Sequence, residues 1–439
     1  MERIKKNPAI NKAMLRQSPS THKGSARQSK IWDVIIIGGG ASGMMAGITA
    51  SRLGKSVLIL EKNKSLGEKL KITGGGRCNI TNAEYDTHKF LDNYGKSKDF
   101  LYSPFSIFGA KDTFSFFEKL GLPLVIQARK RAFPHTEKAT DVYLVMKKEL
   151  ERTGAVFKLG VTVIDLIKEN NKIVAVKTKE GMYDARSFIL ATGGTSHPET
   201  GSTGDGFKFL KTLGHSVQSP TPSVVPIEVS DSWVHLLAGV SLSFMKITFF
   251  LDGKKHFFKT GKILFTHFGL SGPLILNSAS RVGAMLEAGK VEATIDVYPD
   301  TDEKNLEDRI LKTFDENKNK TLKNILKDIT PAGTAKAFEM VLGSMSLETK
   351  VHSVTKEDRK KMVKLLKNLP VHITNLMGYD RAVVVDGGVD LKEINTKTMQ
   401  SKLYDNLFIT GDLLNINRRS GGYGLQLCWT TGYLSGANA

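Results

Sequence analysis

The feature that most constrains this chain is an apolar, β-branched run, Ile31 to Ile37, that stops abruptly at a cluster of glycines. Such a run is typical of a strand buried on both faces of a parallel sheet. A helical pattern follows from Met44 to Leu53, and a second apolar run, Val57 to Leu60, ends on Glu61. Strand, turn, helix and strand in this order predict a dinucleotide-binding βαβ unit.

Each glycine of the turn has a separate physical task. Gly38 permits the tight turn, Gly40 lets the backbone approach a pyrophosphate, and Gly43 lets helix and strand pack closely. Glu61, 23 residues after Gly38, is placed to accept hydrogen bonds from ribose hydroxyls. An ordinary glycine-rich turn would explain the glycines but not this acid. The predicted cofactor contacts here are Gly38, Gly40, Ala41, Ser42, Gly43, Glu61 and Lys62.

The carboxylate also limits which dinucleotide fits. It would repel an adenosine 2′-phosphate, so the site suits FAD or NAD and excludes NADP. The free N–H groups at the helix start, together with its positive dipole end, would hold the phosphates.

Length and composition indicate a soluble protein with two or three domains. The chain has 439 residues, of which 40% are hydrophobic and 24% charged. Its two cysteines, Cys78 and Cys428, form neither a disulfide framework nor a metal-ligand set, which favours a reducing compartment. No apolar run is long enough to span a membrane. We therefore predict a cytoplasmic protein with no metal site.

The net charge of +19 raises the question of nucleic-acid binding. Residues 1–30 contain eight Lys or Arg and one acid, so this segment, predicted to be a disordered basic tail, supplies +7 of that charge. The tail also has the composition of a transit peptide, in which case the location would be an organelle matrix. The remaining +12 is consistent with a solvated basic surface that attracts anionic ligands, and nucleic acid is not the favoured partner.

A polar, glycine-dense loop follows the βαβ unit at residues 72–82. Three consecutive glycines remove side chains so that a flat or charged group can lie against the backbone. A flexible connector is the alternative, but it has no need of Arg-Cys-Asn beside the glycines. The predicted cofactor contacts in this loop are Gly74, Gly75, Arg77, Cys78 and Asn79.

Two further apolar strands end on glycine, at residues 187–194 and 406–412. Ligands of α/β proteins bind at such carboxyl ends of strands. The chain then closes with a helix opened by glycines, residues 421–436, whose positive end would face a flavin pyrimidine. The predicted contacts from these segments are Ala191, Thr192, Gly193, Gly411, Asp412, Gly422 and Tyr423. A lone histidine after the first of these strands, His197, is interpreted as solvated.

Between these motifs the patterning changes twice. Residues 156–187 alternate like a small antiparallel meander. From Ser219 prolines punctuate the chain, and β-rich segments are followed by charged helical segments at 302–328 and 334–366. We predict four segments, namely the tail (1–30), a first cofactor-domain piece (31–218), an inserted barrel or sandwich with helices (219–370), and a second cofactor-domain piece (371–439).

The motifs together resemble the aminoacetone-oxidase-like, BaiN-type flavoproteins over about residues 31–439. They are Gly38 to Gly43, Thr73 to Asn79, Ala191 to Gly194, Thr266 to Pro273 and Gly421 to Tyr423. The resemblance implies an α/β fold in which a Rossmann-like FAD-binding domain, in two sequence pieces, is interrupted by a β-barrel plus helices. No covalent-flavin histidine motif is present, so noncovalent FAD is expected.

This chain departs from the family pattern near its end. An acidic loop after Gly411 is replaced by Asn415-Ile416-Asn417-Arg418-Arg419, and Gly424 stands where relatives place Asn. Two arginines there would either favour an anionic substrate or face solvent.

The resemblance implies an FAD-dependent oxidoreductase in which NAD(P)H reduces the flavin and an unidentified small organic substrate or oxygen takes the electrons. A flavin-dependent tRNA-modifying protein is the alternative, motivated by the charge, and a flavin sensor without turnover is a third. No second fingerprint marks a nicotinamide site. The sequence determines neither the substrate, the catalytic acid or base, nor the oligomeric state.

Overall fold

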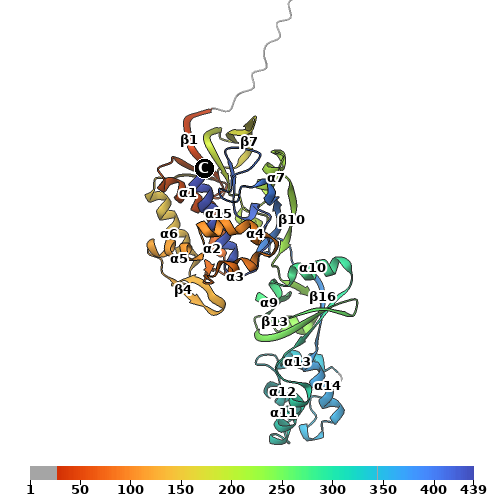
Figure 1. Cartoon of the computed structure of the whole chain (residues 1–439). Helices are drawn as coiled ribbons and strands as arrows, with labels where there is room; N and C mark the ends of the chain where they lie inside the picture. The colour runs from red at the N-terminus through yellow and green to blue at the C-terminus, as the bar shows by residue number, and fades with distance from the viewer. Residues whose placement is uncertain (1–26, 344) are drawn as a thin grey trace, which may run out of the picture.

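The computed structural model describes residues 27–343 and 345–439. Figure 1 shows three regions along the length of the molecule: an α/β domain, a β-barrel beside it, and a group of helices at the far end of the barrel. The chain reaches the barrel and its helices midway and then returns to the α/β domain, where it ends close to its described start (Figure 1).

Strand β1 (Arg27–Ile37) lies at the centre of a mostly parallel sheet. It pairs in parallel with β2 (Val57–Glu61) on one side and with β9 (Met182–Leu190) on the other. Beyond these, β6 (Val156–Leu159) pairs with β2, and β18 (Leu407–Ile409) pairs with β9. All five strands are parallel, so their carboxyl ends meet at one edge of the sheet. The predicted α/β fold with a Rossmann-like βαβ unit is confirmed.

Helix α1 (Ala41–Arg52) follows the glycine turn and is almost wholly buried. The last helix, α15 (Tyr423–Asn438), packs directly against it. A Cβ on Gly432 would lie 2.4 Å from the Ser42 carbonyl oxygen, and one on Gly436 would lie 2.3 Å from the Ala46 carbonyl oxygen. The two helices touch backbone to backbone because these positions carry no side chain.

The other end of the sheet differs from prediction. Strands β7 (Val163–Glu169), β8 (Lys172–Thr178) and β9 form an antiparallel meander. The segment predicted to begin this meander splits, because its first part is β6, a parallel neighbour of β2 on the opposite side of the sheet. A turn at Gly160 separates β6 from β7.

Several short elements complete this domain. A three-stranded sheet includes part of a charged segment around Arg131. Its strands are β3 (Thr81–Asn82), β4 (Leu124–Gln127) and β5 (Arg131–Pro134). The other helices are α2 (Glu68–Ile72), α3 (Thr87–Leu91), α4 (Lys98–Ile107), α5 (Ala110–Lys119), α6 (Ala139–Arg152) and α7 (Asp205–Thr212).

The inserted region contains a closed six-stranded barrel in the order β11-β14-β13-β12-β15-β16. Side chains alternate between the buried interior and the outside along β15, as the two-residue period of a strand requires. The strands are β11 (Ile227–Val229), β12 (Ser241–Leu251), β13 (Lys254–Thr266), β14 (Gly269–Ser271), β15 (Val291–Asp296) and β16 (Leu369–Leu376). Three helices lie against the barrel, namely α8 (Ser232–Leu236), α9 (Pro273–Leu276) and α10 (Ala279–Ala288).

The helices at the far end share one hydrophobic core with the barrel. They are α11 (Glu303–Glu316), α12 (Leu322–Ile329), α13 (Ala335–Leu342) and α14 (Lys356–Lys367). A two-stranded sheet of β10 (Val217–Ser223) and β17 (Val384–Val389) lies where the chain leaves and rejoins the α/β domain.

The domain boundaries stay predictions, but two observations bear on where to draw them. Strand β16 crosses the boundary predicted at 370/371, because it closes the barrel between β15 and β11. Strand β1 begins at Arg27, so residues 27–30 of the predicted disordered tail are strand. The rest of that tail lies outside the described residues. Within the described part of the chain, none of the helices has the length and apolar character of a membrane span.

The contact between α1 and α15 gives the first prediction. We expect Gly432→Ala to lower the free energy of unfolding by about 1–3 kcal/mol, because its methyl group must displace the α1 backbone. Gly283→Ala in α10 is the control, since the added Cβ meets only the flexible end of Leu376. The control should be neutral or stabilising by up to about 1 kcal/mol. Urea unfolding of both variants measures this, and equal stabilities would contradict the packing.

Candidate functional site

A cavity of about 870 Å³ lies at the edge where the parallel strands end. That volume is within the range of ligand-binding pockets in proteins. Five segments that are far apart in sequence line it, namely the βαβ unit, the glycine-dense loop, the residues after β9, the residues after β18 and the start of α15. Residues of β13 and α9 from the inserted region also line it. The predicted cofactor contacts that line it are Gly38, Gly40, Ala41, Ser42, Glu61, Lys62, Gly74, Gly75, Arg77, Asn79, Ala191, Thr192, Gly193, Asp412, Gly422 and Tyr423.

The glycine turn before α1 has the form that a phosphate group requires. A Cβ on Gly40 would meet no atom within 4 Å, so the backbone here is open to a ligand. The first N–H groups of α1, beginning at Ala41, have no acceptor within the helix. Gly43 does not line the cavity. A Cβ there would lie 2.0 Å from the Gly38 carbonyl oxygen, which agrees with its predicted packing task.

The Glu61 carboxylate is buried and organises the turn around it. It accepts hydrogen bonds from the backbone N–H of Gly39 at 2.7 Å and of Asn63 at 2.8 Å. A carboxylate has about four lone-pair positions, so acceptor capacity toward a ribose remains. Its neighbour Lys62 is ion-paired with Asp205 at 2.7 Å, which joins the start of α7 to the end of β2.

The glycine-dense loop after α2 has an open backbone and one side chain that contacts the start of α15. Gly75, with φ of +66°, would place a Cβ in open space. Arg77 lies over the Phe133 ring and is ion-paired with Glu137 at 3.3 Å. The Asn79 amide, oriented to suit its neighbours, accepts from the N–H of Gly422 at 2.9 Å and donates to backbone carbonyls. Asn79 thereby ties this loop to the start of α15.

The end of β9 is packed tightly against the glycine turn. A Cβ on Gly38, whose φ is +100°, would lie 2.5 Å from the Ala191 carbonyl oxygen. A Cβ on Gly206 would lie 2.2 Å from the Thr192 hydroxyl oxygen. Gly193, the next residue, lines the cavity.

Asp412 belongs to a buried cluster of charges that the motifs did not reveal. Arg418 and Lys69 both form ion pairs with this carboxylate, Lys69 at 3.3 Å. Lys69 also contacts the Ser196 hydroxyl. Burial raises the pKa of Asp412, but the two cations outweigh it and lower the pKa from 3.8 to about 2. The carboxylate is therefore ionised at neutral pH.

Sequence reasoning missed Lys69 and noted Arg418 only as a departure. A signal was available, because a buried carboxylate at a strand end requires a counter-ion. Lys69 lies in α2, and nothing in the local pattern connects it with a residue 343 positions later. Gly411 does not line the cavity; its N–H donates to the Thr431 hydroxyl at 3.0 Å.

The start of α15 closes this side of the cavity. Gly422 has φ of +99°, and a Cβ there would lie 2.3 Å from the Thr81 backbone, so only glycine fits. The Tyr423 carbonyl accepts from the Tyr94 hydroxyl at 2.8 Å. The helix begins at Tyr423 and directs its free N–H groups toward the cavity.

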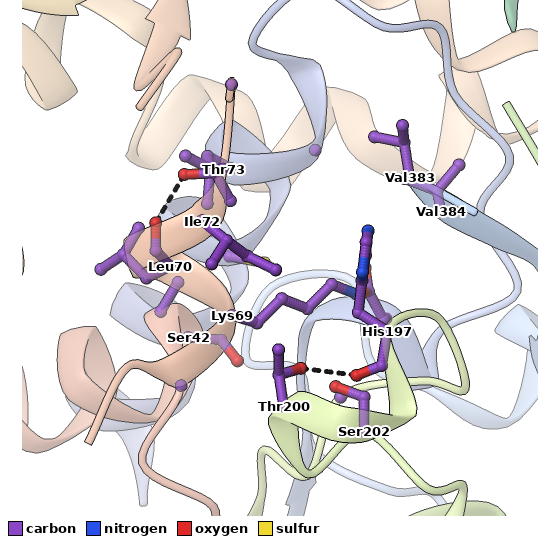
Figure 2. Close-up of a pocket in the computed structure, with 18 of the residues that line it drawn as sticks. Ser42, Lys69, Leu70, Ile72, Thr73, His197, Thr200, Ser202, Val383 and Val384 are labelled. Atoms are coloured by element: carbon purple, nitrogen blue, oxygen red, sulfur yellow. Dashed lines mark hydrogen bonds and ion pairs between the residues drawn. The ribbon is translucent and has the colours of Figure 1, made fainter. Parts of the chain in front are cut away.

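Figure 2 shows the opposite walls of the cavity. The Lys69 side chain extends from α2 past Ser42 toward the loop that carries His197 and Thr200. His197 lines the cavity and its Nδ1 lies 2.8 Å from a Glu199 carboxylate oxygen. It is thus placed in the site and is not a freely solvated residue. Val383 and Val384 lie on the far side, near the return to the α/β domain (Figure 2).

The thiols of Cys78 and Cys428 lie in different positions, but both are protonated at neutral pH. Cys78 is buried and does not line the cavity, whereas Cys428 of α15 lines it. Burial raises the pKa of each thiol from 9.0 to about 12. Both are free thiols, and neither is ionised at neutral pH.

The comparison with known proteins identifies the family. The HI0933-like protein Rossmann domain matches residues 32–438. The chain belongs to the HI0933-like family. This is a family of FAD-binding Rossmann oxidoreductases, which confirms the resemblance drawn from the motifs.

Two relatives with curated names align with nearly the whole chain. A 3-dehydro-bile acid delta(4,6)-reductase of Clostridium scindens is 28% identical over 407 residues, 92% of this chain and 98% of the relative. A ribosomal RNA dihydrouridine synthase of Haemophilus influenzae is 29% identical over 405 residues, 91% of this chain and 96% of the relative.

Among solved structures, a 3-ketosteroid delta1-dehydrogenase from Sterolibacterium denitrificans superposes with a TM-score of 0.50. It is 13% identical and the match covers 93% of this chain and 99% of that one. At this identity the likeness is one of fold.

The thiol pKa values give the second prediction. Raising a thiol pKa from 9.0 to about 12 lowers its thiolate fraction at pH 8 about 1,000-fold. The thiolate is the reactive form of a cysteine. We therefore expect both cysteines to react with a disulfide reagent at pH 8 at least 100-fold more slowly in the native protein than in the protein unfolded by urea. This expected slowing is about a tenth of the change in thiolate fraction. Rapid labelling of Cys428 in the native protein would show that it is an activated thiol.

Proposed function

We propose that this chain is an FAD-dependent oxidoreductase that takes electrons from NAD(P)H and passes them to an organic substrate. The observation that carries the proposal is the convergence of five distant segments on one cavity, with the amino ends of α1 and α15 both facing it. Two helix starts offer unpaired N–H groups to the two regions of FAD that carry or acquire negative charge.

The residues present fit noncovalent FAD. The open backbone at Gly40 suits a pyrophosphate against α1, and Glu61 suits the adenosine ribose. Asp412 is ionised and retains acceptor positions for ribityl hydroxyls beside its two cations. The start of α15 at Gly422 suits the pyrimidine end of the isoalloxazine. When bound, FAD would supply the hydride chemistry, and the protein supplies placement and electrostatics.

The inserted region bounds the cavity where a substrate would enter. Pro273 and Asn277 line it from the barrel side. The Asn277 side-chain oxygen accepts from the N–H of Ser420 at 2.9 Å, which joins the insert to the loop before α15. A substrate would therefore lie between the two regions, a common position for ligand sites.

The names of the relatives suggest the class of substrate. A delta(4,6)-reductase of a 3-dehydro-bile acid and a dihydrouridine synthase are both named for adding hydrogen across a carbon–carbon double bond. In each name's substrate the double bond is conjugated with a carbonyl group. We propose a small molecule with such a conjugated double bond as the electron acceptor here, with oxygen as the other acceptor.

A second candidate is RNA modification, and a specific observation favours it. Three arginines, Arg77, Arg129 and Arg131, line the cavity. Burial and the two adjacent arginines lower the pKa of Arg131, which shows that like charges gather there. Such a group of cations would be stabilised by phosphates, and one relative is named for acting on ribosomal RNA.

The third prediction tests the redox function. We expect the purified protein to be yellow and to lose its absorbance at the flavin band when mixed anaerobically with NADH or NADPH, because a nicotinamide can transfer hydride to bound FAD. Adding a conjugated enone should restore the colour.

Glu61→Arg should bind FAD at least tenfold more weakly, since it removes the acceptor for ribose and both backbone contacts, each worth about 1 kcal/mol.

The control for that charge change is Glu118→Arg, on the exposed face of α5. A colourless protein that does not take up added FAD would overturn the redox proposal altogether. A yellow protein that neither nicotinamide bleaches would overturn only the choice of electron donor.

The fourth prediction separates RNA from small-molecule substrates. If RNA binds at the cavity, residues 27–439 alone should bind a labelled single-stranded RNA. The double variant Arg129→Gln with Arg131→Gln should reduce the slope of the logarithm of the binding constant against the logarithm of salt concentration by about 1.4, or 0.7 per phosphate contact. Lys304→Gln with Lys312→Gln on α11 is the matched control. Fluorescence anisotropy at several salt concentrations measures both. Binding that disappears with residues 1–26 would argue against this candidate.

A further inference from the structure

The Arg418 guanidinium lies against the first turn of α15. Arg418 is only 5% exposed. A Cβ on Gly424 would lie 3.3 Å from Arg418 Nε and 3.8 Å from its Nη2. Gly424 thus leaves the space in which the arginine head group is seated, at the same helix start that faces the cavity.

The partners of Arg418 leave one of its donors unused. One terminal nitrogen is paired with Asp412, and the other donates to the Ile416 carbonyl at 3.1 Å. Arg418 Nε is buried and has no hydrogen-bond partner among the described residues. Arg418 lines the cavity, so its positive charge lies beside any ligand bound there.

The local charge points to the kind of acceptor. Two cations, Arg418 and the partly exposed Lys69, share the single carboxylate of Asp412, so this cluster carries more positive than negative charge. The amino end of α15 adds a partial positive charge of its own. A buried excess of positive charge is unfavourable unless an anionic group completes it.

We propose that Arg418 is a positioning residue for the bound cofactor, and that it stabilises the negative charge which the isoalloxazine ring acquires on reduction. The proposal rests on the function proposed above, because it requires FAD in this cavity. The FAD pyrophosphate is a second anionic group that the same cation would attract. The two anionic groups can be distinguished because only the isoalloxazine ring changes its charge on reduction. An effect of Arg418 on the reduction potential would therefore indicate the ring.

A charge-balanced set of variants tests this in the full-length holoprotein. Arg418→Gln removes one positive charge, Asp412→Asn removes one negative charge, and the double variant leaves the net charge unchanged. Arg419→Gln is the matched control, because it removes the same charge from an exposed neighbour. Two quantities are measured at saturating FAD: the midpoint potential of the flavin, and the dissociation constant of sulfite, which adds to an oxidised flavin and leaves negative charge on the ring.

We expect Arg418→Gln to weaken sulfite binding at least tenfold and to shift the midpoint potential to more negative values. A tenfold change in the stability of the reduced form corresponds to about 30 mV for a two-electron couple. Asp412→Asn should shift both quantities in the opposite direction, and the double variant should lie close to the wild type. Arg419→Gln should have less than half the effect of Arg418→Gln, because its charge is screened by solvent.

Each other outcome overturns the inference. A change in FAD affinity with unchanged potential and sulfite binding would place the Arg418 charge on the pyrophosphate. Shifts of equal sign in both single variants would indicate general loss of structure, and the double variant, which removes the ion pair as a unit, would then fail to recover. A protein that binds no FAD would instead contradict the proposed function itself.

Discussion

The whole site depends on one constraint, which is that the parallel strands of the main sheet end at a common edge. Strands β1, β2, β9 and β18 are in parallel register, with Ile37 opposite Leu60 and Leu190, and Leu190 opposite Ile409. The paired residues of these strands are buried, and a slip of one residue would exchange the side chains packed on the two faces of the sheet. The residues that follow each of these strands therefore lie together at that edge of the sheet.

A second constraint joins the two sequence pieces of the α/β domain. The contact of α15 with α1 is made backbone to backbone at Gly432 and Gly436. This brings the amino end of α15 beside the amino end of α1, and Asn79 then fixes the start of α15 through the N–H of Gly422. Two helix dipoles consequently point at one cavity, which neither piece of the chain could form alone.

The sequence predicted those parts of the site that depend on local backbone rules. The turn at Gly38, the acid Glu61 and the strand end at Gly193 each follow from neighbours within a few residues. The parallel placement of β6 did not follow, because strand alternation is the same for parallel and antiparallel partners. Likewise nothing in the local sequence shows that β16 closes a barrel with β11.

Side-chain partnerships over long distances were the least predictable part. Lys69 and Asp412 are 343 residues apart, and their ion pair depends on how α2 and β18 meet at the sheet edge. The environment of Cys78 was equally hidden, because the sequence placed it in a loop that touches the cavity while the fold buries its side chain. A glycine-rich motif indicates that a ligand approaches, but it does not show which of its side chains turn away.

The buried charges are better explained by function than by stability. Burying Asp412 with Arg418 carries a desolvation penalty that the attraction between them roughly offsets, and an apolar pair of similar volume is often as stable or more so. The arrangement goes further than a neutral pair, since Lys69 adds a second cation and Arg418 Nε is left without an acceptor. A fold that only needed packing would have no reason to hold this excess charge at a helix start. The excess positive charge of this cluster is explained if a negatively charged ligand binds beside it and balances the charge.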